Sequence, residues 1–370
     1  MMKTDIAVIG GGPAGLSAAA WAASSGARVT LIDRNAVLGG QLVKQTHMFF
    51  GSTKQHASVR GFDIAALLQG ELERFRGRID ILTDSTALGL YEDGVLTVEN
   101  ERRYLKIKPS AIIAATGASE KFLAFPNNDL PGICGAGAVQ TLMNQYGVLP
   151  GKSAVMVGAG NIGLIVSYQL MQAGVKVKAV IDAAPRIGGY LVHAAKIRRA
   201  GVPILTSTTV LHAHGGRELE RVTLAALDEN MQPVPGSEFE IETDVLCIAV
   251  GLTPLAELLW QIGCEMRYVP ELGGHVPLRN GEYETTVKNV YVAGDVAGIE
   301  EASSAMVEGR LAGLCAAKNL GLRTEAFEAE RADCLRQLQT LRSGPSGEKI
   351  LKGLEKTVSP EACSERSARG

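Results

Sequence analysis

The sequence has 370 residues, 46% of them hydrophobic, which is enough for two ordinary domains with cores of their own. Its 37 basic and 39 acidic residues leave a net charge of −2, which excludes a chain governed by electrostatic attraction to nucleic acid or to an anionic membrane. The 6 cysteines show no CxxC pair and no metal-ligand spacing. They predict buried thiols in a reducing compartment and no metal site.

The beginning of the chain and its hydropathy bear on location. A strand and a glycine turn start within the first residues, which leaves no room for the apolar segment of a signal peptide. No apolar run of about 18 residues is free of charged and turn residues. We therefore expect a cytoplasmic protein without a membrane span.

The first predicted unit opens with a strand over residues 5–9 and a glycine-rich turn that leads into an alanine-rich helix. Gly10, Gly12 and Gly15 form the pattern GxGxxG, in which one glycine makes the turn, one admits a pyrophosphate to the backbone, and one lets helix and strand pack closely. Pro13 fits the first helical turn, where its missing N–H is not needed. The pattern predicts a diphosphate at the helix N-terminus.

An acidic residue stands at the spacing that this motif requires. A second strand over residues 27–32 ends at Asp33, 23 positions after Gly10. A carboxylate there is expected to accept hydrogen bonds from ribose hydroxyls. Further on, residues 87–90, 95–98 and 103–107 are predicted to be short strands of a β-meander, inserted in a parallel sheet ahead of an apolar strand at residues 111–115.

The same pattern returns in the middle of the chain. Gly158, Gly160 and Gly163 repeat GxGxxG after a strand over residues 154–157, and Asp182 lies 24 positions after the first of these glycines. One GxGxxG is a weak signal, because glycine-rich turns between strands and helices are common. Two copies, each with strand, helix and acid in register, are a strong signal for two dinucleotide-binding domains.

The rest of the chain repeats the organisation of the first unit and then adds a tail. The remaining predicted elements are a helix over residues 162–171, strands over 176–181, 210–214, 219–226, 245–250 and 290–293, and a helix over 302–319. The segment after Gly321 is charged and predicted to be helical, with a break at residues 343–347. We interpret this segment as an appendage.

Several motifs together resemble the pyridine-nucleotide-disulfide oxidoreductase superfamily: both glycine turns, Ala115-Thr116-Gly117, the turn from Gly251 to Pro254, and Gly294-Asp295. The resemblance covers nearly the whole chain. It implies an α/β fold of two Rossmann-like dinucleotide-binding domains, each with a β-meander and the second inserted into the first, plus a helical C-terminal tail. The implied domains are an FAD-binding domain (residues 1–123 and 285–320), an NAD(P)-binding domain (124–284) and a helical extension (321–370).

The resemblance also implies cofactor-binding residues. It assigns the FAD pyrophosphate to Gly10, Gly12 and Gly15, the FAD ribose to Asp33, the ribitol chain to Asp295, and the nicotinamide cofactor to Gly158, Gly160, Gly163 and Asp182. Further cofactor contacts are expected at Pro13, Ala14, Arg34, Gly40, Gln41, Thr116, Gly117, Asn161, Gly251 and Gly294. The acid at Asp182 would repel a 2′-phosphate, although Arg186 could meet one, and we expect NAD rather than NADP.

The family does not by itself name the substrate. Disulfide reductases carry a redox cysteine pair after the second strand's glycines, where this chain has residues 41–47 without a thiol, and thioredoxin reductases carry a CxxC where this chain has Cys134 alone. Disulfide exchange needs two sulfurs within bonding reach, so we expect no redox-active disulfide. Two interpretations of Cys134 stay open: a small buried turn cysteine, which we favour, and a lone peroxidatic cysteine as in some NADH oxidases.

By the family's geometry, the polar and aromatic segment 39–61 runs beside the flavin. Lys44 is a candidate to stabilise negative charge near the reduced ring, and His47 is a candidate proton shuttle because imidazole titrates near neutral pH. The alternative is that both are solvated loop or helix-cap side chains.

A narrower resemblance rests on Gly39-Gly40-Gln41, on Leu149 to Lys152 and on Ser343-Gly344-Pro345. These motifs are similar to the larger flavin subunit of bacterial amine and hydroxy-acid dehydrogenase complexes, of the opine oxidase, hydrogen cyanide synthase and hydroxyproline dehydrogenase type. In that group a second flavoprotein subunit oxidises the substrate and iron–sulfur modules connect the flavins. The tail has only Cys334 and Cys363, too few for a cluster, so a [2Fe–2S] centre would have to lie in a separate protein.

These observations lead to one functional hypothesis and two alternatives. We predict an FAD-dependent oxidoreductase that passes hydride and electrons between a nicotinamide cofactor, FAD and a partner redox subunit or small acceptor, within an oligomer and without binding nucleic acid. The alternatives are a stand-alone NADH oxidase or small-molecule reductase, and a redox-silent FAD-containing scaffold subunit.

Overall fold

The chain divides into two units, one inserted into the other. The computed structural model describes residues 1–101, 103–322 and 324–358. The first unit comprises Met1–Ser119 and Thr253–Gly370, and the second comprises Glu120–Leu252. This insertion agrees with the predicted fold class. The boundary that was predicted after residue 284 is wrong, because the chain returns to the first unit at Thr253.

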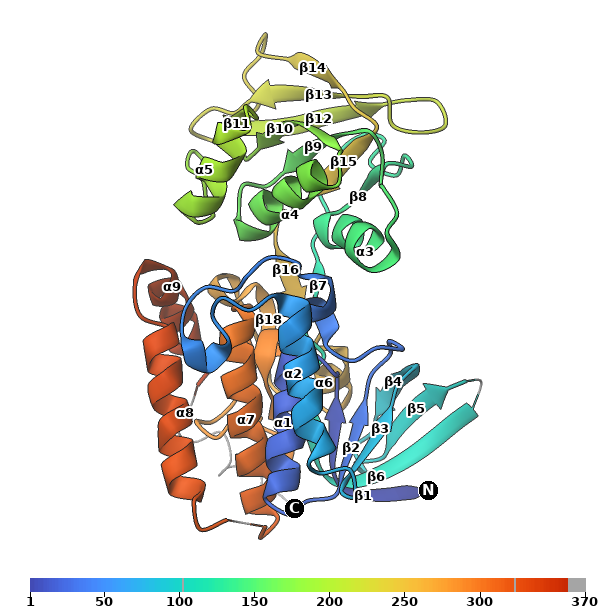
Figure 1. Cartoon of the computed structure of the whole chain (residues 1–370), viewed down its shortest axis with the longest axis vertical. Coiled ribbons are helices and arrows are strands. Elements are labelled where there is room, and N and C mark those ends of the chain that lie inside the picture. The colour runs from blue at the N-terminus through green and yellow to red at the C-terminus, as the bar shows by residue number, and fades with distance from the viewer. Residues whose placement is uncertain (102, 323, 359–370) are drawn as a thin grey trace. The chain divides into compact units, whose positions relative to one another are not determined.

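The first unit is built on a seven-stranded sheet with the order β3-β2-β1-β6-β5-β4, in which β19 also pairs with β6 (Figure 1). Strands β3, β2, β1, β6 and β19 pair in parallel, whereas β4, β5 and the first half of β6 form an antiparallel meander. The strands are β1 (Met2–Ile9), β2 (Val29–Ile32), β3 (Ile79–Leu82), β4 (Ser85–Leu90), β5 (Leu96–Asn100), β6 (Arg103–Ala114) and β19 (Val290–Val292).

Strand β6 replaces two predicted strands. It runs without a break from Arg103 to Ala114. Up to Ile107 it pairs with β5 in antiparallel register, and from Ile107 onward it pairs with β1 in parallel register. The prediction of separate strands at residues 103–107 and 111–115 is therefore wrong, since the chain changes its partner there and not its direction.

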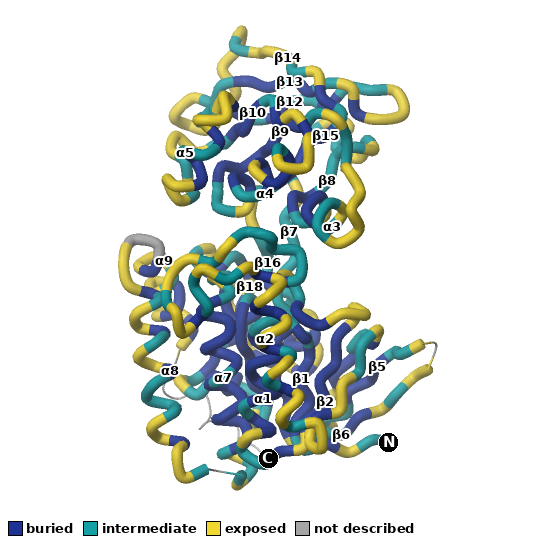
Figure 2. The backbone as a smooth tube through the Cα atoms, in the orientation of Figure 1, coloured by how far each residue is buried: buried dark blue, intermediate teal, exposed yellow. Residues whose placement is uncertain are grey.

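Four helices cover one face of this sheet. They are α1 (Pro13–Ser24), α2 (Gly61–Glu73), α7 (Ala302–Asn319) and α8 (Phe327–Leu341), and they lie side by side in Figure 1. Side chains on β1 alternate as a sheet between two layers requires: Ile6 and Val8 pack with these helices, and Ala7 and Ile9 pack on the other side. The resulting core appears as the continuous dark blue region of Figure 2.

Helices α1 and α7 approach each other closely because α7 presents glycines to α1. A Cβ atom added at Gly309 would lie 2.0 Å from the carbonyl oxygen of Ala14, and one added at Gly313 would lie 2.4 Å from that of Ala18. Both distances are far below van der Waals contact. The small residues of α7 thus place it directly against the helix that follows the first glycine turn.

The segment 253–284 packs into the first unit, which explains the misplaced boundary. It contains α6 (Glu257–Gln261), β17 (Met266–Val269), η3 (Pro270–Leu272) and β18 (Gly274–Pro277). Leu258 and Leu259 join the core beneath the sheet together with Leu96 and Val98 of the meander. The segment resembled a continuation of the second domain only because it follows that domain in the chain.

The C-terminal helices are also part of the first unit and are not an appendage. Phe327 is 2% exposed, Cys334 0% and Leu338 3%, and all three belong to the core that α1 and α7 build. Helix α9 (Pro345–Leu354) packs through Leu354 against Leu272. The predicted helix break is present between α8 and α9. The interpretation as an appendage is wrong. The segment is charged overall, and the few apolar residues that bury one face of α8 did not stand out in the sequence.

The second unit repeats the design on a smaller scale. A parallel sheet with the order β11-β10-β9-β15-β8 has α3, α4 and α5 on one face and a β12-β13-β14 meander on the other. Strand β14 was not predicted, since only one of its four residues is even half-buried. The elements are β8 (Ile133–Gly135), α3 (Ala136–Tyr146), β9 (Ser153–Val157), α4 (Asn161–Gln172), β10 (Lys176–Ile181), α5 (Leu191–Arg199), β11 (Ile204–Leu205), β12 (Thr208–His214), β13 (Arg221–Ala226), β14 (Phe239–Glu242) and β15 (Val245–Ile248).

Two short strands, β7 (Ala118–Glu120) and β16 (Leu252–Pro254), carry the chain between the units and pair with each other. Over the residues that the structure describes, no helix is both long and apolar enough to span a bilayer.

Candidate functional site

The parallel strands of the first unit bring the predicted turn residues to one edge of the sheet. The N–H of Gly10 donates to the carbonyl of Ile32 at 2.8 Å, and the N–H of Ala115 donates to that of Ile9 at 2.8 Å. Gly10, Ala115 and the start of the turn after β2 therefore meet at the carboxyl ends of β1, β2 and β6. Ligands of open α/β sheets bind outside this edge.

Two positions of the first turn accept only glycine. Gly10 has a φ of 106°, and a Cβ atom there would lie 2.2 Å from the carbonyl oxygen of Ala115. A Cβ atom at Gly15 would lie 1.7 Å from the carbonyl oxygen of Gly10. The turn and the close packing of α1 that the motif predicts are therefore both present.

The carboxylate of Asp33 holds this turn. One oxygen accepts the N–H of Gly11 at 2.6 Å, and the other accepts the N–H of Asn35 at 2.7 Å. The residue is only 6% exposed. The side-chain amide of Asn35 donates to the same oxygen as the Asn35 N–H, at 3.0 Å. A carboxylate has about four acceptor positions, so these three bonds leave capacity for one ribose hydroxyl. Asp33 thus lies beside the turn, and the sequence did not reveal that it also fixes the turn.

Segments distant in sequence complete the surroundings of the N-terminus of α1. The N–H of Gly39 donates to the carbonyl of Gly11 at 2.7 Å. A Cβ atom at Gly40 would lie 2.8 Å from the Cα of Gly12, and one at Gly294 would lie 2.9 Å from the Cβ of Ala14. Glycines thus keep the space beside the helix N-terminus free of side chains, as a bound diphosphate requires.

Other predicted contact residues lie beside this turn or face solvent, and the backbone nitrogen of Thr116 would lie 3.3 Å from a Cβ atom at Gly10. The hydroxyl of Thr116 donates to the carbonyl of Leu255 at 2.6 Å, and Gly117 follows it with a φ of 75°. Arg34 and Gln41 are exposed. Pro13 begins α1, as predicted.

Asp295 lies in the short helix η4 (Gly294–Val296), directly after β19. Burial raises its pKa to about 7, the N–H of Glu300 works in the opposite direction, and the Glu308 and Glu300 carboxylates add to the rise. Near neutral pH both the protonated and the ionised form are therefore populated, and each can hydrogen-bond to a neutral hydroxyl ligand. A ribitol chain, the ligand predicted for Asp295, offers hydroxyls of this kind.

Replacing Asp295 by asparagine is expected to change the pH dependence of stability. Because the folded pKa of about 7 exceeds the ordinary value of 3.8, the folded state binds more protons than the unfolded state between these pH values. The free energy of unfolding therefore falls as the pH rises through this range. Without flavin, Asp295→Asn should be more stable than the wild type by roughly 1–3 kcal/mol at pH 8 and by much less at pH 4.

Urea unfolding of both proteins at the two pH values measures this difference. If the difference in the free energy of unfolding were the same at pH 4 and pH 8, the pKa of Asp295 would not be raised in the folded protein.

The predicted catalytic side chains belong to the segment after Gly40. Lys44 is half-buried at the end of η1 (Gly40–Lys44). His47 is half-buried and stacks on Phe49, with ring centroids 5.7 Å apart. The N–H of Phe49 in turn donates to the carbonyl of Val59 at 2.9 Å, which closes the segment into a compact loop. The catalytic roles of Lys44 and His47 remain predictions.

The second glycine turn has the geometry of the first. Gly158 has a φ of 111°, and a Cβ atom there would lie 2.2 Å from the carbonyl oxygen of Ala249. A Cβ atom at Gly163 would lie 2.0 Å from the carbonyl oxygen of Gly158, and Gly160 faces open space. The side chain of Asn161, at the start of α4, accepts the N–H of Tyr190 at 2.8 Å.

Asp182 repeats the role of Asp33. One oxygen accepts the N–H of Ala159 at 2.6 Å, and the other accepts that of Ala184 at 2.8 Å. A hollow of about 300 Å³ opens beside the residues that follow it and is lined by Ala183, Pro185, Ser207, Leu227, Asp228, Glu229 and Met231. Acidic side chains therefore stand both at this turn and in the hollow next to it.

Gly251 and Cys134 lie in the second unit. Gly251 has a φ of 122°, and its carbonyl accepts the N–H of Lys121 at 2.9 Å. Cys134 lies in strand β8 and not in a turn, and Cys247 of β15 is its partner in register. Both are free thiols.

Burial, aided by Glu120, raises the pKa of Cys134 to about 11. The reactive form of a cysteine is the thiolate, which a raised pKa disfavours, so the half-buried Cys134 fits a structural role better than a peroxidatic one. Cys363 lies outside the described residues. Within residues 1–101, 103–322 and 324–358, no group of three or more His, Cys, Asp or Glu side chains is arranged to hold a metal.

Residues 4–309 match the family model described as pyridine nucleotide-disulphide oxidoreductase. The chain belongs to this family. It is accordingly a flavin-dependent oxidoreductase of a family that binds FAD and uses NAD or NADP.

Relatives of known name are components of larger enzymes. The chain is 31% identical over 339 residues to the alpha subunit of sarcosine oxidase from Corynebacterium sp. (strain P-1), a match of 86% of this chain and 33% of that protein. It is 29% identical to one of the subunits of opine oxidase from Agrobacterium tumefaciens (strain Ach5), over 86% of this chain and 66% of that one. The HcnB subunit of hydrogen cyanide synthase from Pseudomonas protegens is 26% identical over 90% of this chain and 76% of its own. The chain thus spans less than two thirds of the first two relatives.

Solved structures share the fold. L-proline dehydrogenase from P. horikoshii aligns with a TM-score of 0.70 at 23% identity, over 90% of this chain and 59% of that one. Thioredoxin reductase from T. acidophilum aligns with a TM-score of 0.70 at 22% identity, over 86% of this chain and 99% of that one. Both likenesses support the predicted arrangement of two dinucleotide-binding domains.

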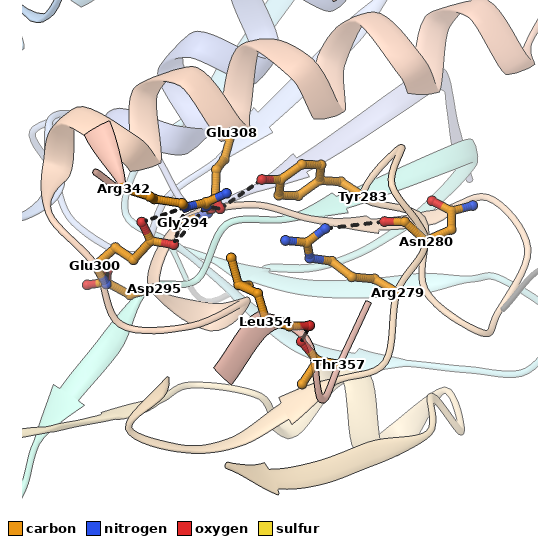
Figure 3. Close-up of polar contacts among 10 residues, drawn as sticks. All are labelled: Arg279, Asn280, Tyr283, Gly294, Asp295, Glu300, Glu308, Arg342, Leu354 and Thr357. Carbon is orange, nitrogen blue, oxygen red and sulfur yellow. Dashed lines mark hydrogen bonds and ion pairs between the residues drawn. The ribbon is translucent and has the colours of Figure 1, made fainter. Parts of the chain in front are cut away.

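The structure adds residues that the sequence did not single out. Glu308 lies in α7, is 3% exposed, and accepts the N–H of Gly294 at 2.8 Å, while Arg342 at the end of α8 contacts Glu308 (Figure 3). A signal for Glu308 existed, because it is the one acid in residues 302–317, which apart from Arg310 are otherwise small or apolar. Arg342, a single arginine just before the Gly-Pro break, could not be recognised in the sequence in this way.

Proposed function

We propose that the first unit binds FAD, that the second binds NAD, and that the chain passes electrons between this pair and a partner redox subunit or small acceptor. When bound, the two cofactors supply the redox chemistry, a hydride transfer between nicotinamide and flavin N5. The protein binds and orients them and sets the charges around them.

The observation that carries this proposal is the repetition of one geometry. In each unit a glycine with positive φ lies against the carbonyl of a neighbouring strand, and the middle residue of the turn donates to an aspartate at 2.6 Å. Each turn leads into a helix whose first N–H groups have no partner within the helix. Two such cradles in one chain fit two diphosphates.

The residues near the second turn favour NAD over NADP. Asp182 stands where the ribose is expected, and Asp228 and Glu229 line the adjacent hollow. Three carboxylates would repel the added charge of a 2′-phosphate. In the first unit we assign the turn glycines to the FAD pyrophosphate, Asp33 to its ribose and Asp295 to the ribitol chain.

Lys44 and His47 are proposed to act near the reacting end of the flavin. Both are half-buried in the segment that begins at Gly40, beside the first glycine turn. A lysine cation can stabilise negative charge on a reduced ring, and an imidazole can carry a proton.

A partner protein is proposed because the named relatives are subunits of oxidases and of hydrogen cyanide synthase. The partner would be a second flavoprotein that oxidises the substrate, with a separate [2Fe–2S] protein where an iron–sulfur centre is needed. Such a complex makes this chain one member of an oligomer.

Anaerobic titration of the FAD-loaded protein with NADH and with NADPH tests the proposal. We expect NADH to bleach the flavin absorbance with one equivalent per chain and NADPH to act much more weakly. A flavin spectrum that neither nucleotide changes would contradict the proposal and favour the redox-silent scaffold. Rapid reoxidation by oxygen or a quinone without a partner would instead favour a stand-alone oxidase.

Asp182→Ala is expected to weaken NADH binding by roughly tenfold, because it removes both the ribose acceptor and the bond to Ala159. FAD affinity should not change. Asp244→Ala is the matched control, since Asp244 also accepts two backbone N–H groups in this unit, from Lys152 at 2.8 Å and Ser153 at 2.7 Å, but at the opposite edge of the sheet. If the wild type and Asp182→Ala bound NADH equally well, the proposal that Asp182 binds the ribose of NADH would be wrong.

A further inference from the structure

A buried ion-pair network joins the C-terminal helices to the loop that carries Asp295. The guanidinium of Arg342 bonds side-on to Glu300, with Nε 3.0 Å from Oε2 and Nη2 2.7 Å from Oε1 (Figure 3). The same Nη2 donates to Oε1 of Glu308. The side chain of Arg342 is 9% exposed, as is that of Glu300, and the side chain of Glu308 is 4% exposed.

Glu308 transmits this contact to the backbone of the loop. Its Oε2 accepts the N–H of Gly294 at 2.8 Å, and its Oε1 also accepts the hydroxyl of Tyr283 at 2.9 Å. The N–H of Glu300 lies 3.4 Å from an oxygen of Asp295. Arg342 therefore holds the residues on both sides of Asp295 through two carboxylates.

The charges of the network depend on Arg342. Burial opposes the charge of Arg342, but the Glu308 and Glu300 carboxylates outweigh it, so the pKa of the guanidinium is raised. Burial raises the pKa of Glu300 as well, with Glu308 adding to the effect and Arg342 opposing it. Without the arginine, two buried carboxylates would face each other beside Asp295. Removing one member of a buried pair leaves an uncompensated charge, which is strongly unfavourable.

Another cation nearby has different partners. The guanidinium of Arg279 stacks over the ring of Tyr283 at 3.8 Å and donates to the carbonyl of Asn280 at 3.2 Å. Arg279 thus supports the tyrosine ring, whereas Arg342 is the cation that bonds to the carboxylate of Glu308.

The tail is fixed at further points of the same unit. In α8, Asp333 pairs at 3.1 Å with Lys54, which lies within the segment 39–61 that is expected to run beside the flavin. After α9, the carbonyl of Thr357 accepts the N–H of Arg279 at 3.1 Å. The helix break at Ser343-Gly344 lets α9 fold back on the carbonyl of Arg342, against which Gly347 packs with no room for a Cβ. These contacts give Arg342 one defined position.

We infer that Arg342 is a positioning residue of the flavin site, and that the C-terminal helices hold the Gly294-Asp295 loop in place through its contacts with Glu308 and Glu300. This inference rests on the proposed FAD site of the first unit. The arginine acts through the loop whose aspartate is proposed to bind the ribitol chain.

Arg342→Met tests the inference in the full-length protein. We expect the dissociation constant for FAD, followed by quenching of flavin fluorescence, to rise roughly tenfold or more, as is typical when a residue that orients a direct ligand is lost. Amide exchange of the peptide that contains Gly294 should become faster, while peptides of residues 120–252 keep their protection. The FAD affinity of Arg342→Lys should lie between those of the wild type and Arg342→Met. A lysine keeps the positive charge, but one ammonium cannot bond side-on to Glu300 and also reach Glu308 as the guanidinium does.

Two controls separate positioning from general stability. Phe327→Ala removes a core side chain from the same helix without touching Glu308, and Arg336→Met removes an exposed arginine that pairs with Asp333 within α8. At a temperature where all variants are folded, both should keep FAD affinity within about twofold of the wild type. If Arg342→Met does not fold, the FAD affinities of Arg342→Lys and Phe327→Ala are compared instead. A weaker affinity in Arg342→Lys than in Phe327→Ala supports the positioning role, and equal affinities contradict it.

FAD binding by the wild type tests the proposed function, and FAD binding by the variants tests the role of Arg342. If the wild type does not bind FAD, the proposed function fails. If the wild type binds FAD and Arg342→Met binds it equally well, or if Phe327→Ala loses as much affinity as Arg342→Met, the positioning role of Arg342 is wrong while the proposed function stands.

Discussion

Gly10→Ala is expected to weaken FAD binding by roughly a hundredfold and to leave NADH binding in place, and Gly158→Ala is expected to do the reverse. At each position the added Cβ would meet a carbonyl oxygen at 2.2 Å, and φ is 106° at Gly10 and 111° at Gly158. The strained backbone and the clash must distort the turn, at a cost of about 3 kcal/mol or more, which corresponds to roughly a hundredfold loss of affinity. Fluorescence titration with each cofactor measures both effects.

Matched alanine substitutions show that the effect comes from the turns. Gly70, in α2, and Gly188, after β10, have open space around them and no positive φ. Gly70→Ala should leave FAD affinity unchanged and stabilise the helix by about 0.5–1 kcal/mol, and Gly188→Ala should leave NADH affinity unchanged. If Gly10→Ala weakened NADH binding more than FAD binding, the assignment of cofactors to the two units would be wrong.

Phe327→Ala is expected to destabilise the first unit by about 3–5 kcal/mol, because it empties a fully buried aromatic position. Phe327 is 2% exposed and packs in the same core as α1 and α7. For a unit of this size, such a loss should lower the melting temperature by roughly 10 °C. Scanning calorimetry and urea unfolding measure the effect.

Leu335→Ala is the matched control on the same helix, since Leu335 is 39% exposed. Its effect should stay below about 1 kcal/mol. Equal, small effects of both substitutions would mean that α8 is only loosely attached, which would restore the interpretation of the tail as an appendage.

The sequence predicted the two turns well because their signals are local. A glycine is required wherever φ is positive or a Cβ would meet a carbonyl, and Gly10, Gly15, Gly158 and Gly163 meet one of these conditions within a few residues of chain. The helix predicted at residues 302–319 has the same bounds in the structure. Period and spacing suffice for features of this kind.

The errors concern contacts between distant parts of the chain. Strand β6 was predicted as two strands because the sequence does not show that one continuous strand pairs with β5 up to Ile107 and with β1 beyond it. Residues 253–284 were assigned to the wrong domain, because the amino-acid composition does not change where the chain leaves the inserted unit. The network of Arg342 joins residues 34 and 42 positions away, and its burial is fixed by helices that pack only in the folded protein.

The number and kind of dinucleotides bound by one chain tests the central claim most directly. We expect the purified protein, after incubation with FAD, to be yellow with one flavin per chain and then to bind one NADH per chain in calorimetric titration. A protein that stays colourless with added FAD, or one whose flavin and NADH compete for a single place, would contradict the account of two separate cradles.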